Sequence, residues 1–356
     1  MLSESFQQQI TSLKQQIETA LIETLDQQQW PDALRQAVEY SLMAGGKRLR
    51  PGLVLIATNV CGGESQTALP AACAIEMIHT YSLIHDDLPC MDDDDLRRGR
   101  PTSHKVFGEA LATLAGDALL TLAFETLGAA RTSPVVTADC LRILASAAGG
   151  SGMVGGQILD LEAERGAFPG VEQQISAAGS DASESSREAS NSGTNGDYGG
   201  KNSSNSLPQP VSEASSNEES PIAASESTGI RVEHLIKIHK MKTGALITAA
   251  MELGASVASA SPEQRIRLIE YGRCTGLAFQ IADDLLDVTG SDERLGKETG
   301  RDNELGKLTY PSLIGIESSR AKAQSLVDSA CTALDIFDSQ ADPLRELARF
   351  IVERDH

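Results

Sequence analysis

The chain has 356 residues, with 50 acidic and 30 basic side chains and a formal net charge of −20. A charge of this sign and size excludes nucleic acid as a general partner and excludes a general attraction to anionic membrane surfaces. Six widely spaced cysteines, no secretory signal and no apolar run of bilayer-spanning length together indicate a cytoplasmic protein with reduced thiols and no membrane span.

Apolar residues recur at a spacing of three to four through most of the chain, which is the period of an α-helix. Alternating β-branched segments bounded by turns, the pattern of strands, are nearly absent. Helices are expected over residues 10–25, 33–44, 69–84, 109–130, 138–148, 235–253, 264–286 and 321–334. Several of these stretches are rich enough in alanine to be buried among other helices. The pattern predicts an all-α fold, a single large bundle of about ten helices.

A basic segment, Gly-Gly-Lys-Arg-Leu-Arg-Pro at residues 45–51, follows the second expected helix. Lys47 and Arg50 are cations of the kind that grip phosphate oxygens. Arg48 lies between them, and we expect it to be only a solvated neighbour.

The expected helix over residues 69–84 leads into an acidic cluster at residues 86–95. Carboxylates this crowded are costly at the end of an apolar helix unless a cation holds them together. A calcium loop beginning at Asp92 does not fit, because its sixth position is Arg97 instead of glycine and its twelfth is Ser103 instead of glutamate.

A second acidic cluster, Asp-Asp-Leu-Leu-Asp at residues 283–287, closes the expected helix over residues 264–286. Asp283 and Asp287 are four residues apart and therefore share one helical face. Mg²⁺ suits such faces, because it takes one or two carboxylates and leaves its other positions for water and substrate phosphates. One isolated cluster could equally be a solvated acidic face. Two clusters accompanied by basic motifs instead predict the metal-assisted handling of a diphosphate.

The composition changes abruptly over residues 166–229, where Ser, Gly, Asn, Glu and Ala dominate. This segment contains nine acidic residues and only two basic ones. Such a segment cannot bury enough apolar surface to offset its conformational entropy. We therefore expect a disordered insertion. It divides the bundle into an N-terminal part, residues 1–165, with the first acidic cluster, and a C-terminal part, residues 230–356, with the second.

Five motifs in this order resemble those of the trans-isoprenyl diphosphate synthases, and most of all the bacterial farnesyl diphosphate synthases. They are the basic segment at 45–51, the string at 83–99, Gly155-Gly156-Gln157 with Asp160, Lys242-Thr243-Gly244, and the string at 276–284. The resemblance runs from about residue 35 to the C-terminus, apart from the insertion. It implies the isoprenoid-synthase fold, in which the helices surround a central cavity.

The resemblance implies a prenyltransferase that condenses isopentenyl diphosphate with dimethylallyl or geranyl diphosphate. The product would be all-trans farnesyl diphosphate, with release of diphosphate, and the enzyme a homodimer. Two or three Mg²⁺ ions per active site would hold the allylic diphosphate, with Asp86, Asp92 and Asp283 as metal ligands. The catalytic residues carried over by the resemblance are Asp86, Asp87, Asp92, Lys242, Asp283 and Asp284.

Two diphosphates need different sites, because isopentenyl diphosphate must bind intact and therefore without metal. His79 lies seven residues before Asp86, about two helical turns, and so nearly on the same face. A lone histidine there would otherwise be typical of a satisfied helix-face residue. The substrate-binding residues that the resemblance implies are Lys47, Arg50, His79, Arg97, Arg98, Lys242, Thr243, Gln280 and Lys297.

The length of the product is predicted from the residues just upstream of the first cluster. Tyr81 and Ser82 lie five and four residues before Asp86. A bulky aromatic side chain at the fifth position resembles the channel floor of farnesyl synthases, which favours a fifteen-carbon product. Tyr81 could instead be a packed core aromatic. The four residues between Asp87 and Asp92 occur in both farnesyl and plant-type geranylgeranyl synthases, so a geranylgeranyl diphosphate synthase is the alternative.

Two other classes remain as competing hypotheses. A class I terpene cyclase would also ionise a diphosphate with metal, but it would leave the basic segment at residues 45–51 unexplained. An inactive regulatory homologue usually lacks the aspartates of one cluster, and here both clusters are complete.

Overall fold

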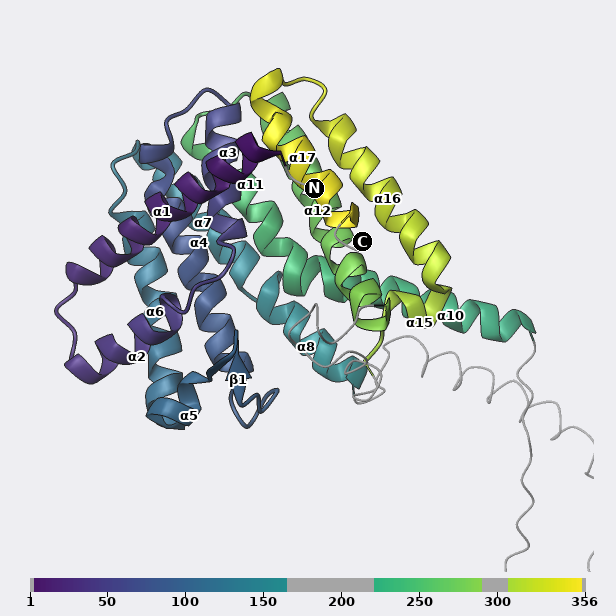
Figure 1. Ribbon diagram of the computed structural model, residues 1–356, viewed down its shortest axis with the longest axis horizontal. Helices are drawn as coiled ribbons and strands as arrows, with labels where there is room; N and C mark the ends of the chain where they lie inside the picture. The colour runs from purple at the N-terminus through teal and green to yellow at the C-terminus, as the bar shows by residue number, and fades with distance from the viewer. Residues whose placement is uncertain (1–2, 165–220, 290–306, 354–356) are drawn as a thin grey trace, which may run out of the picture. The chain divides into compact units, whose positions relative to one another are not determined.

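A computed structural model describes residues 3–164, 221–289 and 307–353 (Figure 1). Within these residues the only strands form a two-stranded antiparallel hairpin, β1 (Leu96–Arg97) and β2 (Arg100–Pro101). The all-α prediction is confirmed. The helices are α1 (Glu4–Asp26), α2 (Asp32–Leu42), α3 (Leu49–Val60), α4 (Ser65–Asp86), α5 (Ser103–Phe107), α6 (Glu109–Gly128), α7 (Pro134–Ala148), α8 (Met153–Glu164), α10 (Pro221–His239), the π-helix η1 (Lys240–Gly244), α11 (Ala245–Val257), α12 (Pro262–Thr289), α15 (Tyr310–Ile314), α16 (Ile316–Ala333), the short 3₁₀ helix η2 (Ser339–Ala341) and α17 (Asp342–Glu353).

The chain divides into two units, residues 1–165 with 235–356 and residues 166–234. Helix α10 begins at Pro221, which lies inside the segment 166–229 for which the sequence predicts disorder. Helical structure therefore resumes earlier than residue 230. Residues 166–220 lie outside the described part of the chain. Both acidic clusters belong to the first unit.

Helix α4 lies inside the first unit and packs against α3, α6 and α11 (Figure 1). Every residue from Ala71 to Ile78 is buried, which is the pattern of a helix with apolar neighbours on all sides. Helix α11 in turn packs on α3, α7 and α12, and α12 packs on α16. Small residues allow these close approaches. A Cβ atom added at Gly254 of α11 would lie 2.5 Å from the carbonyl oxygen of Val54 on α3.

Both ends of the described chain are tied together. Ser3 caps α1 by accepting a hydrogen bond from the backbone N–H of Phe6. The Ser3 hydroxyl also donates to a carboxylate oxygen of Glu346 on α17, at 2.9 Å. The first and last helices of the unit are thereby linked.

Helix α6 corrects one expectation from the sequence. By length and composition alone, Glu109–Gly128 is apolar enough to cross a membrane, although the sequence analysis expected no such run. Core helices of soluble proteins pass the same test, so one helix of this kind is weak evidence for a membrane span. Ala112, Ala115 and Leu119 of α6 are fully buried in the hydrophobic core, and the helix packs along α4.

The expectation for Arg48 was wrong. Its side chain is buried at the start of α3, where it forms a 2.6 Å ion pair with Glu76 of α4 and donates to the carbonyl oxygen of Leu42 at 2.7 Å. The Glu76 carboxylate is buried as well. This pair joins α3 to α4 and thereby holds the basic segment against the helix that carries the first acidic cluster.

Glu76→Ala is expected to lower the free energy of unfolding by about 3 kcal/mol, because it leaves the buried Arg48 charge with only the half-buried Glu18 carboxylate, 3.5 Å away, to compensate it. The measurement is urea denaturation of wild type and variant. The matched control is the double variant Arg48→Met with Glu76→Leu, which removes both charges and should recover most of the lost stability. A single variant as stable as wild type would contradict the assignment.

Candidate active site

The first acidic cluster begins at the last residue of α4. The backbone N–H of Asp92 donates to the carbonyl oxygen of Asp86 at 2.8 Å, so the loop folds back and brings the two residues together. Burial raises the pKa of Asp86 to about 6, and the negative charges of Asp92 and Asp87 add to the effect while Lys242 and Arg97 oppose it. Asp92 is exposed and Asp86 half-buried. These carboxylates therefore crowd one another as predicted.

The hairpin after this loop places Arg97 against the acidic cluster. Arg97 on β1 donates through Nε to Asp87 at 2.9 Å and through Nη2 to the same carboxylate, and it also pairs with Asp94 at 3.1 Å. Burial alone would lower the pKa of Arg97, but Asp87 and Asp94 raise it. The predicted diphosphate ligand Arg97 is thus bound to buried Asp87 in this structure.

Lys242 lies on η1, and a π-helix inside a helical run often marks a functional position. Its Nζ donates to Asp160 of α8 at 2.5 Å. Burial by itself would lower the pKa of Lys242, but Asp160, Asp86 and Asp92 outweigh it and raise the pKa. Lys242 therefore lies within electrostatic reach of the first acidic cluster.

Asp160 belongs to the site through this ion pair, although the sequence analysis named it only as part of a family motif and gave it no role. The sequence signal that could have identified Asp160 is its place in the motif with Gly155-Gly156-Gln157. Gly156 belongs to the same motif, but the sequence analysis gave it no part in positioning Lys242. A Cβ atom there would overlap the backbone nitrogen of Lys242, so α8 approaches η1 this closely only because residue 156 is glycine.

The second acidic cluster lies near the C-terminal end of α12. Asp284 is buried and accepts a hydrogen bond from the backbone N–H of Tyr310 at 2.9 Å, and the ring of His239 lies 4.0 Å from it. Asp284 thus ties α12 to α15 and to the end of α10. Asp283, one residue earlier, is half-buried.

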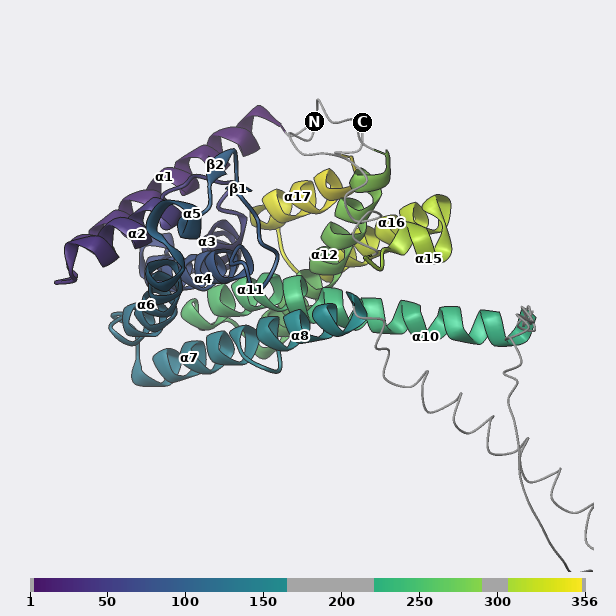
Figure 2. The ribbon, with the colours of Figure 1, turned by 90° about the horizontal axis from the view of Figure 1, so that it is seen from below.

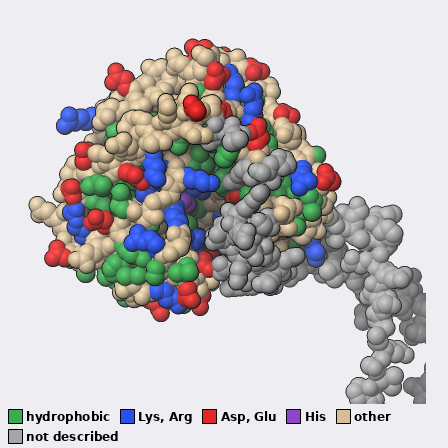
Figure 3. Space-filling view, in the orientation of Figure 1, with side chains coloured by type: hydrophobic (Ala, Val, Ile, Leu, Met, Phe, Trp, Pro, Cys, Tyr) green, Lys and Arg blue, Asp and Glu red, His purple; other side chains and the backbone are tan. Residues whose placement is uncertain are grey.

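A cationic region lies beside these carboxylates. Burial lowers the pKa of His79 well below its usual value, and the positive charges of Arg50, Arg98, Arg48 and Arg97 lower it further. Burial also lowers the pKa of Arg50, which lies within electrostatic range of Arg98 and Asp283. Lys and Arg side chains gather around a hollow on the face drawn in Figure 3. The region can therefore attract an anion.

Arg50 and Arg98 also show how this region is built. The Nε atom of Arg50 is buried and has no hydrogen-bond partner among the described residues. Arg98 donates to the carbonyl oxygen of Gly45 and passes so close to Gly46 that a Cβ atom there would clash with its guanidinium. Gly46 of the basic segment thereby makes room for an arginine from the hairpin, and the Gly45 carbonyl oxygen binds it.

The remaining predicted residues lie as follows. Tyr81 is buried, with its ring 5.7 Å from the His85 ring in an edge-to-face contact, and the half-buried Ser82 donates to the carbonyl oxygen of His79 at 2.9 Å. Thr243 and Gln280 are half-buried, and Lys47 is exposed. Lys297 lies outside the described residues.

The carboxylates of the two clusters are the candidate ligands for Mg²⁺. In the described ranges, no three His, Cys, Asp or Glu side chains converge closely enough to hold a metal by themselves. Mg²⁺ does not require such a cage, because it keeps several waters and binds through one or two carboxylates plus phosphate oxygens. The crowded carboxylates of Asp86 and Asp92, with a cationic region alongside, fit a metal that arrives with a diphosphate.

Comparisons with known proteins agree with this geometry. The chain matches the family model of polyprenyl synthetase over residues 31–176 and 217–336. It is 42% identical over 329 residues, 91% of this chain and 73% of the relative, to the chloroplastic heterodimeric geranylgeranyl pyrophosphate synthase large subunit 1 of Arabidopsis thaliana.

Solved structures of prenyl diphosphate synthases have a similar fold. An FPP/GFPP synthase from Zymomonas mobilis has a TM-score of 0.70 at 36% identity, covering 98% of this chain and 99% of that chain. A geranylgeranyl pyrophosphate synthetase from Pyrococcus horikoshii Ot3 has a TM-score of 0.74 at 27% identity, covering 99% of this chain and 100% of that chain. The protein therefore belongs to the polyprenyl synthetase family and is a trans-prenyltransferase.

Proposed function

We propose that this trans-prenyltransferase condenses isopentenyl diphosphate with allylic diphosphates and releases geranylgeranyl diphosphate, a twenty-carbon product. The observation that carries the proposal is one site with two kinds of anion-binding surface. Asp86 and Asp92 lie within electrostatic reach of Lys242, and His79 lies within electrostatic reach of four arginines. Two diphosphates can bind such a site in different ways, one through metal and one through cations alone.

On the carboxylate side, Asp86, Asp92 and Asp283 would hold Mg²⁺. Bound there, Mg²⁺ would neutralise the charge that develops on the departing diphosphate. Lys242, kept charged by Asp160, lies beside Asp86 and stabilises the same negative charge. Thr243 on η1 and Gln280 on α12, both half-buried, would contact the allylic substrate.

On the cationic side, Arg50, Arg98 and Lys47 would bind isopentenyl diphosphate without metal. Charge-assisted hydrogen bonds from arginine to phosphate are strong and directional. The unpartnered Nε of Arg50 is one donor that such a phosphate would satisfy. His79 is held neutral by burial and by the surrounding arginines, so it can bind phosphate only as a neutral hydrogen-bond donor.

The twenty-carbon product is supported by the relatives. The chloroplastic Arabidopsis thaliana protein and a geranylgeranyl pyrophosphate synthase of Catharanthus roseus, 40% identical over 92% of this chain, are both named for geranylgeranyl pyrophosphate. These names support the alternative better than the farnesyl product predicted first. Farnesyl diphosphate remains the second candidate, because Tyr81 is a bulky buried side chain one turn before Asp86.

The test is product analysis. Purified protein is incubated with labelled isopentenyl diphosphate, geranyl diphosphate and Mg²⁺, and the products are separated by chain length. A twenty-carbon main product supports the proposal, and a fifteen-carbon one replaces it with the farnesyl candidate. Cyclised hydrocarbons, or no extension with any allylic partner, would overturn both.

Two expectations about the whole molecule remain proposals. A homodimer is to be tested by light scattering of the purified protein. The cytoplasmic location is to be tested by cell fractionation, because the Arabidopsis thaliana and Catharanthus roseus relatives are named as chloroplastic.

Gly156→Ala is expected to lower kcat by about 100-fold, because the added Cβ overlaps the backbone of Lys242 and forces η1 to shift by a fraction of an ångström or more. Gly150→Ala is the matched control, since a Cβ atom there meets nothing within 4 Å. Steady-state kinetics are measured together with the Tm of each variant. An unchanged kcat in Gly156→Ala would show that the position of Lys242 is unimportant.

A further inference from the structure

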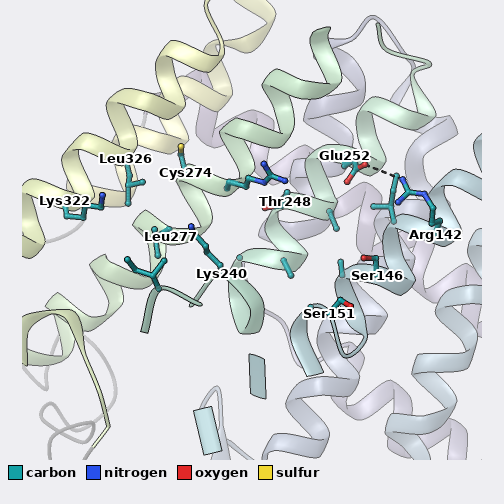
Figure 4. Close-up of a pocket in the computed structure, with 18 residues that line it drawn as sticks. Arg142, Ser146, Ser151, Lys240, Thr248, Glu252, Cys274, Leu277, Lys322 and Leu326 are labelled. Atoms are coloured by element: carbon teal, nitrogen blue, oxygen red, sulfur yellow. Dashed lines mark ion pairs between the residues drawn. The ribbon is translucent and has the colours of Figure 1, made fainter. Parts of the chain in front are cut away.

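A groove with a volume of about 670 Å³ lies outside the site described above. Its walls come from α7, the turn before α8, the end of α10, η1, α11, α12 and α16 (Figure 4). None of its lining residues is among the predicted catalytic or substrate-binding residues. Ligand pockets usually measure about 300–1,000 Å³, so the groove is large enough for a molecule with a long chain.

One end of the groove is cationic. Lys240 of η1, Arg273 of α12 and Lys322 of α16 are exposed and line it. No ion pair joins any of the three to another described residue, although the whole chain carries a net charge of −20. In Figure 4, Lys240 and Lys322 lie at the same end of the groove as Cys274. Three cations from three helices therefore line the groove, and at least two of them, Lys240 and Lys322, are available to an anion at this end.

The rest of the groove is largely apolar. Ile143 and Ala147 of α7 line it together with Ala245 and Ala249 of α11. In Figure 4, Leu277 of α12 lies next to Lys240. Arg142 and Glu252 lie at the opposite end, 3.7 Å apart (Figure 4). Their charges offset each other, so the net positive charge of the groove comes from Lys240, Arg273 and Lys322.

Helix η1 separates this groove from the catalytic residues. Lys242 turns toward Asp160, whereas Lys240 and Gly244 of the same short helix line the groove. The groove therefore borders η1 without being lined by Lys242 or Asp160.

We propose that the groove binds an amphipathic anion with a diphosphate head and an isoprenoid chain. Lys240, Arg273 and Lys322 bind the head through charge-assisted hydrogen bonds. The chain lies over the aliphatic side chains of α7 and α11. The choice of ligand rests on the proposed function, because compounds of this class are its products.

Cys274 reports on the occupancy of the groove. It is a lining residue and half-buried. Burial raises the pKa of its thiol, Glu270 adds to this effect, and Lys240 and Lys322 offset part of it. Cys90 is exposed in the loop between Asp87 and Asp92 and reports on the active-site side. Alkylation of both thiols is followed by mass spectrometry of the separate peptides.

The probe is geranylgeranyl diphosphate, added to the full chain without isopentenyl diphosphate and without divalent metal, so that no turnover occurs. Alkylation of Cys274 is expected to slow as the probe is added. Lys322→Glu and Arg273→Glu are each expected to raise the half-protecting concentration by about tenfold, because a charge-assisted hydrogen bond is lost. Arg320→Glu is the matched control, because Arg320 lies on α16 but outside the groove and pairs with Glu317 at 3.1 Å. In this variant the probe should protect Cys274 at the same concentration as in wild type.

Three outcomes would overturn the proposal. Pyrophosphate alone protecting Cys274 as well as the full probe would show only a small-anion site. Geranylgeraniol protecting equally would show only an apolar groove. If the enzyme elongates isoprenoids but the probe does not protect Cys274, the proposed binding in the groove is refuted and the proposed function stands. Conversely, protection of Cys274 in a protein without prenyltransferase activity would support the groove and refute the proposed function.

Discussion

Asp86→Ala and Asp283→Ala are each expected to lower kcat by about three orders of magnitude at saturating Mg²⁺, while the fold survives. Each variant removes a carboxylate proposed to hold the metal, and several kcal/mol of charge stabilisation are lost with it. Asp86 lies at the end of α4 and Asp283 is half-buried near the end of α12, so neither change opens a cavity in the core. Steady-state kinetics over a range of Mg²⁺ concentrations test the prediction.

The control for both variants is Asp95→Ala. Asp95 belongs to the same acidic run as Asp86 but is exposed and pairs with Lys105 at 2.7 Å. It should leave kcat close to that of wild type, because surface ion pairs of this kind contribute little. Turnover near the wild-type value in Asp86→Ala, with circular dichroism showing a folded protein, would refute the metal assignment for the first cluster.

Tyr81→Ala is expected to lengthen the main product by at least one five-carbon unit relative to wild type. The Tyr81 side chain is buried, and its ring lies against His85 at the end of α4 that carries Asp86. If the growing chain extends along α4 away from the carboxylates, removing this ring opens the space in which the chain stops. Chromatography of the products from wild type and variant, with the same substrates, measures the change.

Tyr81→Phe is the matched control, because it keeps the ring and loses only the hydroxyl group. It should release a product of wild-type length. Truncating a large buried aromatic side chain to alanine commonly costs about 3–5 kcal/mol of stability, so the Tm of each variant has to be measured beside its products. A folded Tyr81→Ala that stops at the wild-type length would show that Tyr81 is a core aromatic and does not limit the product.

The fold class and the family could be predicted from the sequence because both depend on local information. A helix is encoded by the spacing of apolar residues within a few turns, and the alanine-rich run of α4 already indicated a buried helix. The family motifs are also short strings of neighbouring residues, such as the basic segment at 45–51. The length of the product was harder to predict from the sequence. A single side chain such as Tyr81 can limit it only if the fold places that side chain in the path of the growing chain.

The sequence by itself thus determined an all-α chain with two acidic clusters and a set of basic motifs. Only the tertiary structure decided which of these charges meet. Arg48 proved to be buried against Glu76, and Lys242 pairs with Asp160, which is 82 residues away in the chain. Three cations of η1, α12 and α16 that form no ion pair with any described residue line one groove. Ion pairs and grooves depend on distances between helices, and helical periodicity carries no information about those distances.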